Sequence, residues 1–238
     1  MSRARYGVDA PPALFGLVSG AVLLIPGTIL TAVNAGWWAL WPAAVFVYLA
    51  GSAALYLHTT KRGKFAVWAE ILDDLGLRGD ERVLDLGCGR GAVLIAVAKR
   101  LPQGHVTGAD LWRSVDQSGN APEVTTANAA AEGVAGRVSL DTADMTALPY
   151  PDDSFDLVVA SMAIHNIHPA RGRRTALDEA LRVLRPGGRL VIADISAAKS
   201  YQAHLTERGL APAIRSLGWR MWWGGPWLPT LLVTAVKT

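Results

Sequence analysis

The chain has 238 residues, of which 51% are hydrophobic and 18% are charged, and its formal net charge is +3. An apolar share of this size can form a folded core, which excludes a disordered chain. A single cysteine, Cys88, excludes a disulfide framework and a cysteine-rich zinc site, and we expect no metal centre. The small net charge gives no indication of a nucleic-acid partner.

Charge is distributed unevenly along the chain. Residues 10–57 contain no Lys, Arg, Asp, Glu or His, whereas residues 61–238 contain 21 Lys and Arg and 19 Asp and Glu. The second composition is ordinary for a water-soluble domain, and the first is typical of a membrane segment. We therefore expect an N-terminal membrane anchor over residues 1–60 and a soluble domain over residues 61–238.

The uncharged segment contains two stretches long enough to cross a bilayer. Residues 13–33 and 37–57 are 21 residues each, and about 20 apolar residues in a helix span the hydrocarbon core. Residues 34–36, Asn-Ala-Gly, form a turn signal between them. This pattern predicts two transmembrane helices joined as a hairpin, with a cluster of tryptophans beside the turn at the membrane interface.

Basic residues around the predicted hairpin indicate its orientation. Arg3 and Arg5 precede the first stretch, a basic cluster at residues 61–64 follows the second, and the turn has no Lys or Arg. Because cytoplasmic loops carry the excess of Lys and Arg, both ends of the chain should lie in the cytoplasm. The predicted location is therefore a membrane, crossed twice, with the soluble domain on the cytoplasmic side.

Two other interpretations of the N-terminal segment compete with the hairpin. The first stretch could be a signal peptide with residues 33–35 as its cleavage site, but it exceeds the usual ~7–15 residues and a second stretch follows. Alternatively, both helices could be buried in a soluble core, but core helices normally keep a polar face.

Beyond residue 61, short strands alternate with segments of helical composition. We expect helices over residues 92–100, 122–132, 173–184 and 201–208. We expect strands over residues 82–86, 105–109, 138–140, 155–160, 189–193, 219–223 and 231–236. This alternation predicts a mostly parallel sheet with helices on both faces, and a ligand site beyond the carboxyl ends of the strands.

A glycine-rich loop follows the first strand of this domain. Residues 83–91 have the sequence Val-Leu-Asp-Leu-Gly-Cys-Gly-Arg-Gly. Glycines let the backbone turn sharply and approach a ligand closely, and amides at the helix start offer hydrogen-bond donors. The loop also fits a loose dinucleotide fingerprint, so by itself it does not choose between NAD and other nucleotides.

Acidic residues after the next two strands narrow the choice of ligand. Asp110 ends the second strand, where a carboxylate can accept hydrogen bonds from both ribose hydroxyls. Asp144 follows the third strand, where it can accept from an exocyclic adenine amine while Met145 packs on the ring. Together with residues 154–158 and 185–188, these motifs form an ordered set of five.

This set resembles the class I S-adenosylmethionine-dependent methyltransferases, specifically the methyltransferase type 11 group that includes the ubiquinone/menaquinone C-methyltransferases. The resemblance covers residues 76–238 and implies a Rossmann-like, doubly wound, mostly parallel seven-stranded sheet. It also implies S-adenosyl-L-methionine as the cofactor and S-adenosyl-L-homocysteine as the product. The cofactor-binding residues that it implies are Asp85, Gly87, Cys88, Gly89, Gly91, Asp110, Leu111, Asp144, Met145 and Ser161.

By the family pattern, the glycines would wrap the methionine end of the cofactor, with Asp85 near its amino group. Asp110 would hold the ribose, Leu111 would pack on the adenine, and Ser161 would face the cofactor or the acceptor. Cys88 lies between two glycines, where a small packing role is the simplest interpretation.

Two residues are candidate catalytic bases. His165 follows the fourth strand, at the edge where an acceptor would lie, and histidine can take a proton near neutral pH. Asp116 belongs to the loop 112–120, which we expect to help shape the acceptor pocket. His165 could instead only shape that pocket.

The leading hypothesis is a membrane-anchored methyltransferase acting on a small, lipophilic acceptor such as a phenol, thiol, quinone or lipid, with the bilayer concentrating that acceptor. One alternative is a protein methyltransferase whose substrate is a membrane-associated protein. Others are a non-catalytic cofactor-binding scaffold and an NAD-dependent oxidoreductase.

Overall fold

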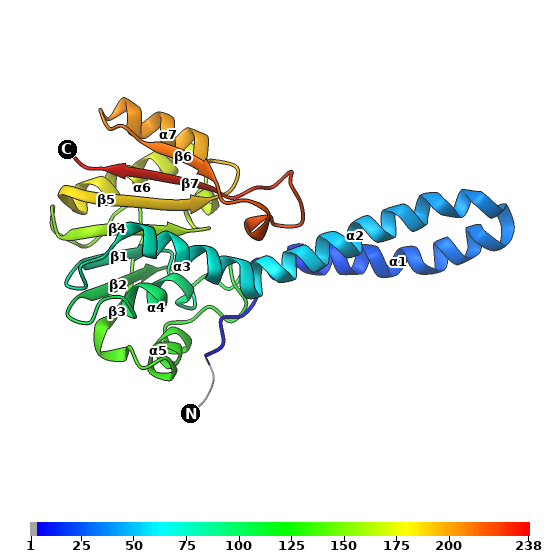
Figure 1. Cartoon of the computed structure of the whole chain (residues 1–238), viewed down its shortest axis with the longest axis horizontal. Helices are drawn as coiled ribbons and strands as arrows, with labels where there is room; N and C mark the ends of the chain where they lie inside the picture. The colour runs from blue at the N-terminus through cyan, green and yellow to red at the C-terminus, as the bar shows by residue number, and fades with distance from the viewer. Residues whose placement is uncertain (1–3) are drawn as a thin grey trace.

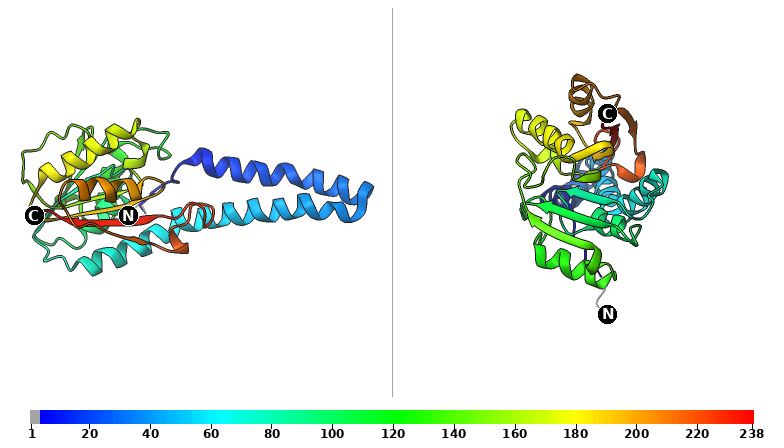
Figure 2. Two further views of the ribbon diagram at one scale, coloured as in Figure 1. Left: turned by 90° about the horizontal axis from the view of Figure 1, so that it is seen from above. Right: turned by 90° about the vertical axis from the view of Figure 1, so that its left-hand side faces the viewer.

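The computed structural model describes residues 4–238 and shows an α/β core from which a pair of long helices projects (Figure 1). We call this projection the helical arm. It consists of α1 (Pro11–Ala35), the short 3₁₀ helix η1 (Gly36–Ala39) and α2 (Leu40–His58). The chain folds back at η1, so that α1 and α2 lie side by side in both views of the molecule (Figures 1 and 2).

The side chains of the arm are apolar and largely exposed. Phe15, Leu23 and Val33 on α1 are 73%, 74% and 78% exposed, which is incompatible with the alternative that these helices are buried in a soluble core. Helical conformation continues from Pro11 to Leu75, through the fold-back at η1, and this run as a whole is long and apolar enough to cross a membrane. Two crossings stay a prediction.

The arm is continuous with the core. After α2, the π-helical segment η2 (Thr59–Gly63) leads directly into α3 (Lys64–Leu75), which ends at Gly76 in the left-handed conformation. Trp68 and Leu72 of α3 are buried against the sheet. The sequence pattern alone does not reveal α3, because its start is hidden in the helix that continues from α2.

A seven-stranded sheet forms the centre of the core, in the order β3-β2-β1-β4-β5-β7-β6. The first five strands in this order are parallel, and β7 and β6 are antiparallel to their neighbours. The strands are β1 (Arg82–Leu86), β2 (His105–Asp110), β3 (Val138–Thr142), β4 (Phe155–Ser161), β5 (Leu184–Asp194), β6 (Ala213–Ser216) and β7 (Leu231–Val236). The predicted Rossmann-like, mostly parallel seven-stranded sheet is confirmed.

Helices cover both faces of the sheet (Figure 2). Neighbouring strand residues point to opposite faces, so Val83 packs in one apolar cluster with α3 and α4, and Leu84 packs in the other with α6 and α7. The remaining helices are α4 (Ala92–Ala98), α5 (Pro122–Ala131), α6 (Ala170–Val183) and α7 (Ala198–Glu207), with the 3₁₀ turns η3 (Ala135–Arg137) and η4 (Ile164–Asn166).

One predicted strand is wrong. Residues 219–223 contain the 3₁₀ helix η5 (Trp219–Met221) rather than a strand, because Gly218 turns the chain and the tryptophans pack against α2. The seventh strand is instead β6 (Ala213–Ser216). It lies at the sheet edge with three of its four residues exposed, so it has no alternating apolar pattern that would identify it.

The carboxyl ends of the parallel strands face the arm (Figure 1). In a sheet of this kind the ligand site lies beyond those ends. We call the residues that join the arm to the core, 9–13 and 56–64, the root of the arm. The site is therefore expected in the space between the sheet edge and this root.

Candidate active site

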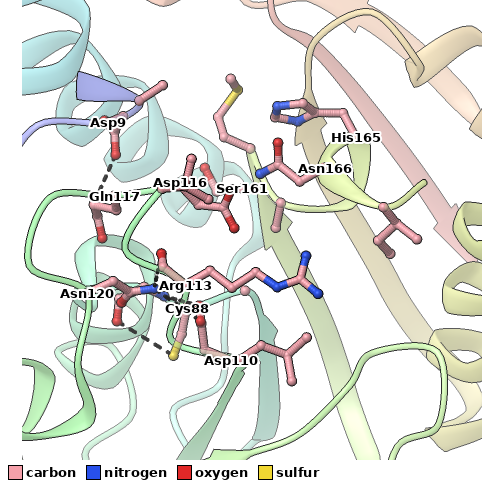
Figure 3. A pocket seen from close by; sticks show the side chains of 18 of the residues that line it. Asp9, Cys88, Asp110, Arg113, Asp116, Gln117, Asn120, Ser161, His165 and Asn166 are labelled. Atoms are coloured by element: carbon pink, nitrogen blue, oxygen red, sulfur yellow. Dashed lines mark hydrogen bonds between the residues drawn. The ribbon is translucent and has the colours of Figure 1, made fainter. Parts of the chain in front are cut away.

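A cavity of about 700 Å³ lies at this edge of the sheet (Figure 3). Eleven of the twelve residues predicted for the site line it, and Gly91 alone among them does not. The eleven are Asp85, Gly87, Cys88, Gly89, Asp110, Leu111, Asp116, Asp144, Met145, Ser161 and His165. Their roles stay predictions.

The glycine loop has a conformation that side chains would disturb. Gly87, Gly89 and Gly91 have φ values of +69°, +49° and +83°, in the left-handed region. A Cβ at Gly87 would lie 2.3 Å from the Cβ of Ala163, and one at Gly89 would lie 2.6 Å from Oε1 of Gln117. The glycines are thus required by both the backbone and the close packing around it.

Asp85, at the end of β1, is buried and both of its carboxylate oxygens lack a hydrogen-bond partner among residues 4–238. Burial raises the pKa of this carboxyl well above its usual value, and the nearby charge of Asp110 raises it further. A buried carboxylate without a partner is costly. A ligand ammonium group would supply the missing partner, so the residue fits the amino group of S-adenosylmethionine.

Asp110, at the end of β2, holds the loops around the cavity together. Its Oδ2 accepts a hydrogen bond from the Gly89 amide at 2.8 Å. Its Oδ1 accepts from the Trp112 amide at 2.6 Å and from the Asn120 side chain at 3.2 Å. The carboxylate is thus fixed beside the glycine loop, where ribose hydroxyls could donate to it. The sequence analysis did not identify Asn120 as part of this arrangement.

Asp144, Met145 and Cys88 also line the cavity. Asp144 accepts hydrogen bonds at 2.8 Å from both the amide and the hydroxyl of Thr146, which fixes its carboxylate beside Met145. Cys88 is buried, and burial, with Asp85 and Asp110, raises the pKa of its thiol. This environment fits an inert packing residue rather than a nucleophile.

Ser161 is tied to the arm side of the core. Its Oγ accepts a hydrogen bond from Nε1 of Trp68 on α3 at 2.9 Å. The serine hydroxyl keeps its own proton to donate toward the cavity.

His165 is held by an aspartate that the sequence analysis did not identify. Asp194, at the end of β5, is fully buried, and its Oδ1 lies 2.5 Å from Nδ1 of His165. Its Oδ2 accepts from the His165 amide at 3.0 Å and from the Tyr201 hydroxyl at 3.1 Å. Burial and the adjacent carboxylate raise the pKa of Tyr201, which keeps its hydroxyl a donor.

This arrangement fixes the tautomer of the His165 ring. When Nδ1–H donates to a carboxylate, the lone pair lies on Nε2, as in other histidine bases oriented by an acid. Nε2 has no partner among the described residues. The signal that could have identified Asp194 is its place at the carboxyl end of a parallel strand.

Asp116, the second candidate base, lies on the loop 112–120 and also lines the cavity (Figure 3). Burial raises the pKa of Asp116, while the charge of Arg113 opposes the rise. Its backbone carbonyl accepts a hydrogen bond from the Ala10 amide at 3.1 Å. The chain just before the arm therefore reaches this loop.

The root of the arm contributes to the cavity wall, which the sequence analysis did not foresee. Asp9, Ala10, Pro12 and Ala13 line it from the N-terminal side. Lys64 of α3 lines it as well, as does Trp223 of the C-terminal loop, which we define as residues 217–230 between β6 and β7.

Residues 83–188 match the family described as "Methyltransferase domain". The region that contains the candidate site is therefore similar to a methyltransferase domain. The matched residues run from β1 into β5 and include the glycine loop, Asp110, Asp144 and His165. The arm and the C-terminal loop lie outside the matched residues.

Curated relatives are similar over this same region. The chain is 39% identical over 126 residues to the methyltransferase GfsG of Streptomyces halstedii, covering 53% of this chain and 42% of that protein. It is 35% identical over 135 residues to the ubiquinone/menaquinone biosynthesis C-methyltransferase UbiE of Roseobacter denitrificans, covering 56% and 50%. The chain thus spans about half the length of these curated relatives.

The fold is shared with solved structures at lower identity. Geranyl diphosphate C-methyltransferase from Streptomyces coelicolor A3(2), in complex with Mg²⁺, geranyl diphosphate and S-adenosyl-L-homocysteine, superposes with a TM-score of 0.59 at 17% identity. The match covers 73% of this chain and 77% of that chain. At this identity the likeness shows the fold alone.

Proposed function

We propose that the protein is a membrane-anchored methyltransferase that transfers the methyl group of S-adenosylmethionine to a small, lipophilic acceptor. The observation that carries this proposal is the lining of the cavity. It includes both the glycine loop with Asp85 and Asp110 and the start of an exposed apolar arm, with Pro12 and Ala13.

The cofactor half of the cavity supports the first part of the proposal. When bound, the cofactor supplies a methyl group that is already activated for transfer. Asp85 would bind the ammonium group, Asp110 the ribose hydroxyls, and Asp144 with Met145 the adenine edge. The contribution of these residues is to orient the methyl group toward the acceptor, because positioning is a large part of catalysis in such a displacement.

His165 favours an acceptor that loses a proton. Its oriented Nε2 would remove the proton of a hydroxyl as the new bond to carbon forms, and Asp194 would stabilise the imidazolium. A phenol, with a pKa near 10, gains more from such a base than a thiol, with a pKa of about 8.5. Among the acceptor classes, an aromatic or other weakly acidic hydroxyl therefore fits best.

The arm supports membrane attachment. Its helices of 25 and 19 residues are about 37 Å and 28 Å long, close to the roughly 30 Å of a bilayer core. Exposed tryptophans lie at the far end, where Trp37, Trp38 and Trp41 are 66%, 52% and 67% exposed. We propose that the arm crosses the bilayer twice, with its root on the cytoplasmic side.

Aromatic residues also lie along the half of the arm closer to the core. Trp219 stacks on His58, at the near end of α2, with ring centroids 5.0 Å apart, and Trp227 packs against Tyr48, near the middle of α2, at 5.3 Å. Both tryptophans are more than half exposed. Because tryptophan favours the interface between lipid and water, the C-terminal loop would rest on the membrane beside the arm.

The test is an acceptor screen with isotopically labelled S-adenosylmethionine and the full chain in lipid vesicles, against phenols, thiols, quinones and lipid extracts. It should include pairs of acceptors with the same reacting group, one with an alkyl tail and one without. The matched control replaces residues 14–55 by a short Gly-Ser linker, which retains the cavity-lining residues Asp9, Ala10, Pro12 and Ala13, and also Tyr56, whose hydroxyl donates to the Asp9 carbonyl.

We expect label in a small molecule, and a KM for the tailed acceptor that is lower with the arm than without it, while the tailless acceptor is unaffected. Label found in membrane protein instead would indicate a protein methyltransferase. Equal KM values for the two chains would contradict membrane entry and leave the arm as an anchor only.

A further inference from the structure

Asp9, the second residue before α1, is bound by residues at the end of α2 and in the segments that follow it. Its Oδ2 accepts a hydrogen bond from the Thr60 hydroxyl at 2.5 Å and forms an ion pair with Nζ of Lys64 at 2.6 Å. The backbone amide of Asp9 donates to the same Thr60 hydroxyl at 3.1 Å, and Tyr56 of α2 donates to its carbonyl at 2.9 Å. The two ends of the arm therefore meet at this one residue.

The same carboxylate is connected to the cofactor loop. Its Oδ1 accepts a hydrogen bond from Nε2 of Gln117 at 2.8 Å (Figure 3). Oε1 of Gln117 in turn accepts from the Arg90 amide at 2.8 Å, inside the glycine loop. Two hydrogen bonds through one side chain thus join the arm root to the loop that would wrap the cofactor.

The backbone around Asp9 reinforces this connection. Asp9 and Gln117 form an antiparallel β-bridge, and the Ser118 amide donates to the Val8 carbonyl at 3.2 Å. The Val8 amide donates to the Ser118 hydroxyl at 3.0 Å. The segment before the arm therefore lies along the loop 112–120, which contributes to the lining of the cavity.

Burial makes this network strong. The side chains of Lys64 and Asp9 are only 9% and 19% exposed, and Gln117 is 9% exposed. Removing one member of such a network leaves the others buried without partners, which costs more than the loss of an exposed pair. A change in either segment of the root should therefore be felt at Gln117.

We propose that Asp9 is a positioning residue that couples the helical arm to the cofactor site through Gln117. The coupling rests on S-adenosylmethionine being the cofactor, but not on the identity of the acceptor. Because such a coupling is reciprocal, cofactor binding should also tighten the root of the arm. The root of the arm then helps to hold the loop that binds the cofactor, in addition to joining the arm to the core.

The experiment measures the Kd of S-adenosylmethionine and of S-adenosylhomocysteine by calorimetry, on the full chain in vesicles. The variants are Asp9→Ala, Gln117→Ala and the double variant. The control is Asp178→Asn, which removes the charge that pairs with Arg208 and His204, none of which lines the cavity. Asp9→Asn is a conservative variant that keeps an oxygen for Gln117 but loses the charge that faces Lys64.

We expect Asp9→Ala and Gln117→Ala each to raise the Kd about tenfold, as the loss of one charge-assisted hydrogen bond would. The double variant should raise the Kd no further than the more damaging of the two single variants does, because both substitutions break the same series of hydrogen bonds. Asp9→Asn should recover part of the affinity, and Asp178→Asn should leave it within about twofold, as for a surface substitution.

A second readout is amide hydrogen exchange with and without S-adenosylhomocysteine. In the wild-type chain the ligand should slow exchange in residues 8–13 and 56–64, and in Gln117→Ala it should slow exchange only around the glycine loop. A folded Asp9→Ala chain with lower thermal stability but an unchanged Kd would overturn the coupling and leave Asp9 a stabilising residue. No binding of either compound by the wild-type chain would overturn the cofactor assignment and the coupling with it.

Discussion

Asp194 accepts hydrogen bonds from both the backbone amide and the ring of His165, so one buried carboxylate fixes the position and the tautomer of the histidine. The two residues come from neighbouring parts of the sheet edge, His165 after β4 and Asp194 at the end of β5. His165 lines the cavity, where an acceptor would lie, and Asp194 is fully buried next to it.

The first prediction concerns this pair. His165→Ala and Asp194→Asn should each lower kcat about 10²-fold with a hydroxyl acceptor, since general-base catalysis typically contributes 10²- to 10⁴-fold. The Kd of S-adenosylmethionine should be unchanged in both, because neither residue lies beside the glycine loop. Tyr201→Phe is the matched control, because it removes one donor to Asp194 but leaves His165 held. An effect of His165→Ala on KM alone would show that the ring only shapes the pocket.

The second prediction concerns the proton on Asp85. Burial raises the pKa of this carboxyl in the ligand-free protein, yet the cofactor ammonium would pair with its ionised form. Cofactor binding below the raised pKa should therefore release a proton, and the affinity should fall as the pH is lowered through that pKa. Calorimetry in two buffers of different ionisation enthalpy measures the release.

The raised pKa of Asp85 also affects the stability of the folded protein. The folded, ligand-free protein holds the Asp85 proton more tightly than the unfolded chain does, so this residue makes the protein less stable as the pH rises toward the raised pKa. Asp85→Asn should abolish both the proton release and this contribution. Proton uptake on binding, or the same proton release from Asp85→Asn, would contradict the assignment.

The third prediction concerns the glycine loop. Gly87→Ala should lose measurable cofactor binding and lower the free energy of unfolding by about 1–3 kcal/mol, because the residue is held at positive φ and the new methyl group would overlap Ala163. Gly133→Ala is a control for the backbone effect, since Gly133 also has positive φ but nothing lies within 4 Å of the added Cβ. Thermal melts and calorimetry separate the two effects.

The fourth prediction concerns topology. A cysteine introduced by Ala35→Cys should react with a membrane-impermeant reagent added to intact cells, and one introduced by Thr238→Cys should react only after permeabilisation. Background labelling should be low, because the native Cys88 is buried. Equal labelling of the two positions in intact cells would argue against two crossings, and the reverse pattern would place the domain outside.

The strands that carry the site were predictable from the sequence because each is a local pattern. β1 and β7 have the predicted bounds, and β2, β3 and β4 differ from them by one or two residues. The Asp85 loop, Asp110 and Asp144 follow such strands, and parallel strands bring their carboxyl ends together. That geometry needs no knowledge of distant contacts.

The contacts that the sequence did not reveal are between residues far apart in the chain. Asp194 looks like any acid at a strand end until β5 is placed beside β4, and Asp9 looks like the last charge before an apolar segment. Its partners, Thr60 and Gln117, are 51 and 108 residues away. The charge pattern predicts a separate membrane anchor, and only the folded chain shows that residues at the start of the arm line the cavity.

The unbroken passage from α2 through η2 into α3 sets an angular relationship between the arm and the catalytic core. A helix advances about 1.5 Å and turns about 100° with each residue. One residue inserted between His58 and Thr59 would rotate the core around the arm axis by roughly 100°, away from the direction that it faces in the proposed membrane-bound orientation. Seven inserted residues, about two full turns, would restore that direction and move the core about 10 Å further along the axis. In the proposed orientation, the length and the rotation of this helix therefore set both the distance of the cavity from the lipid and the direction in which the cavity faces.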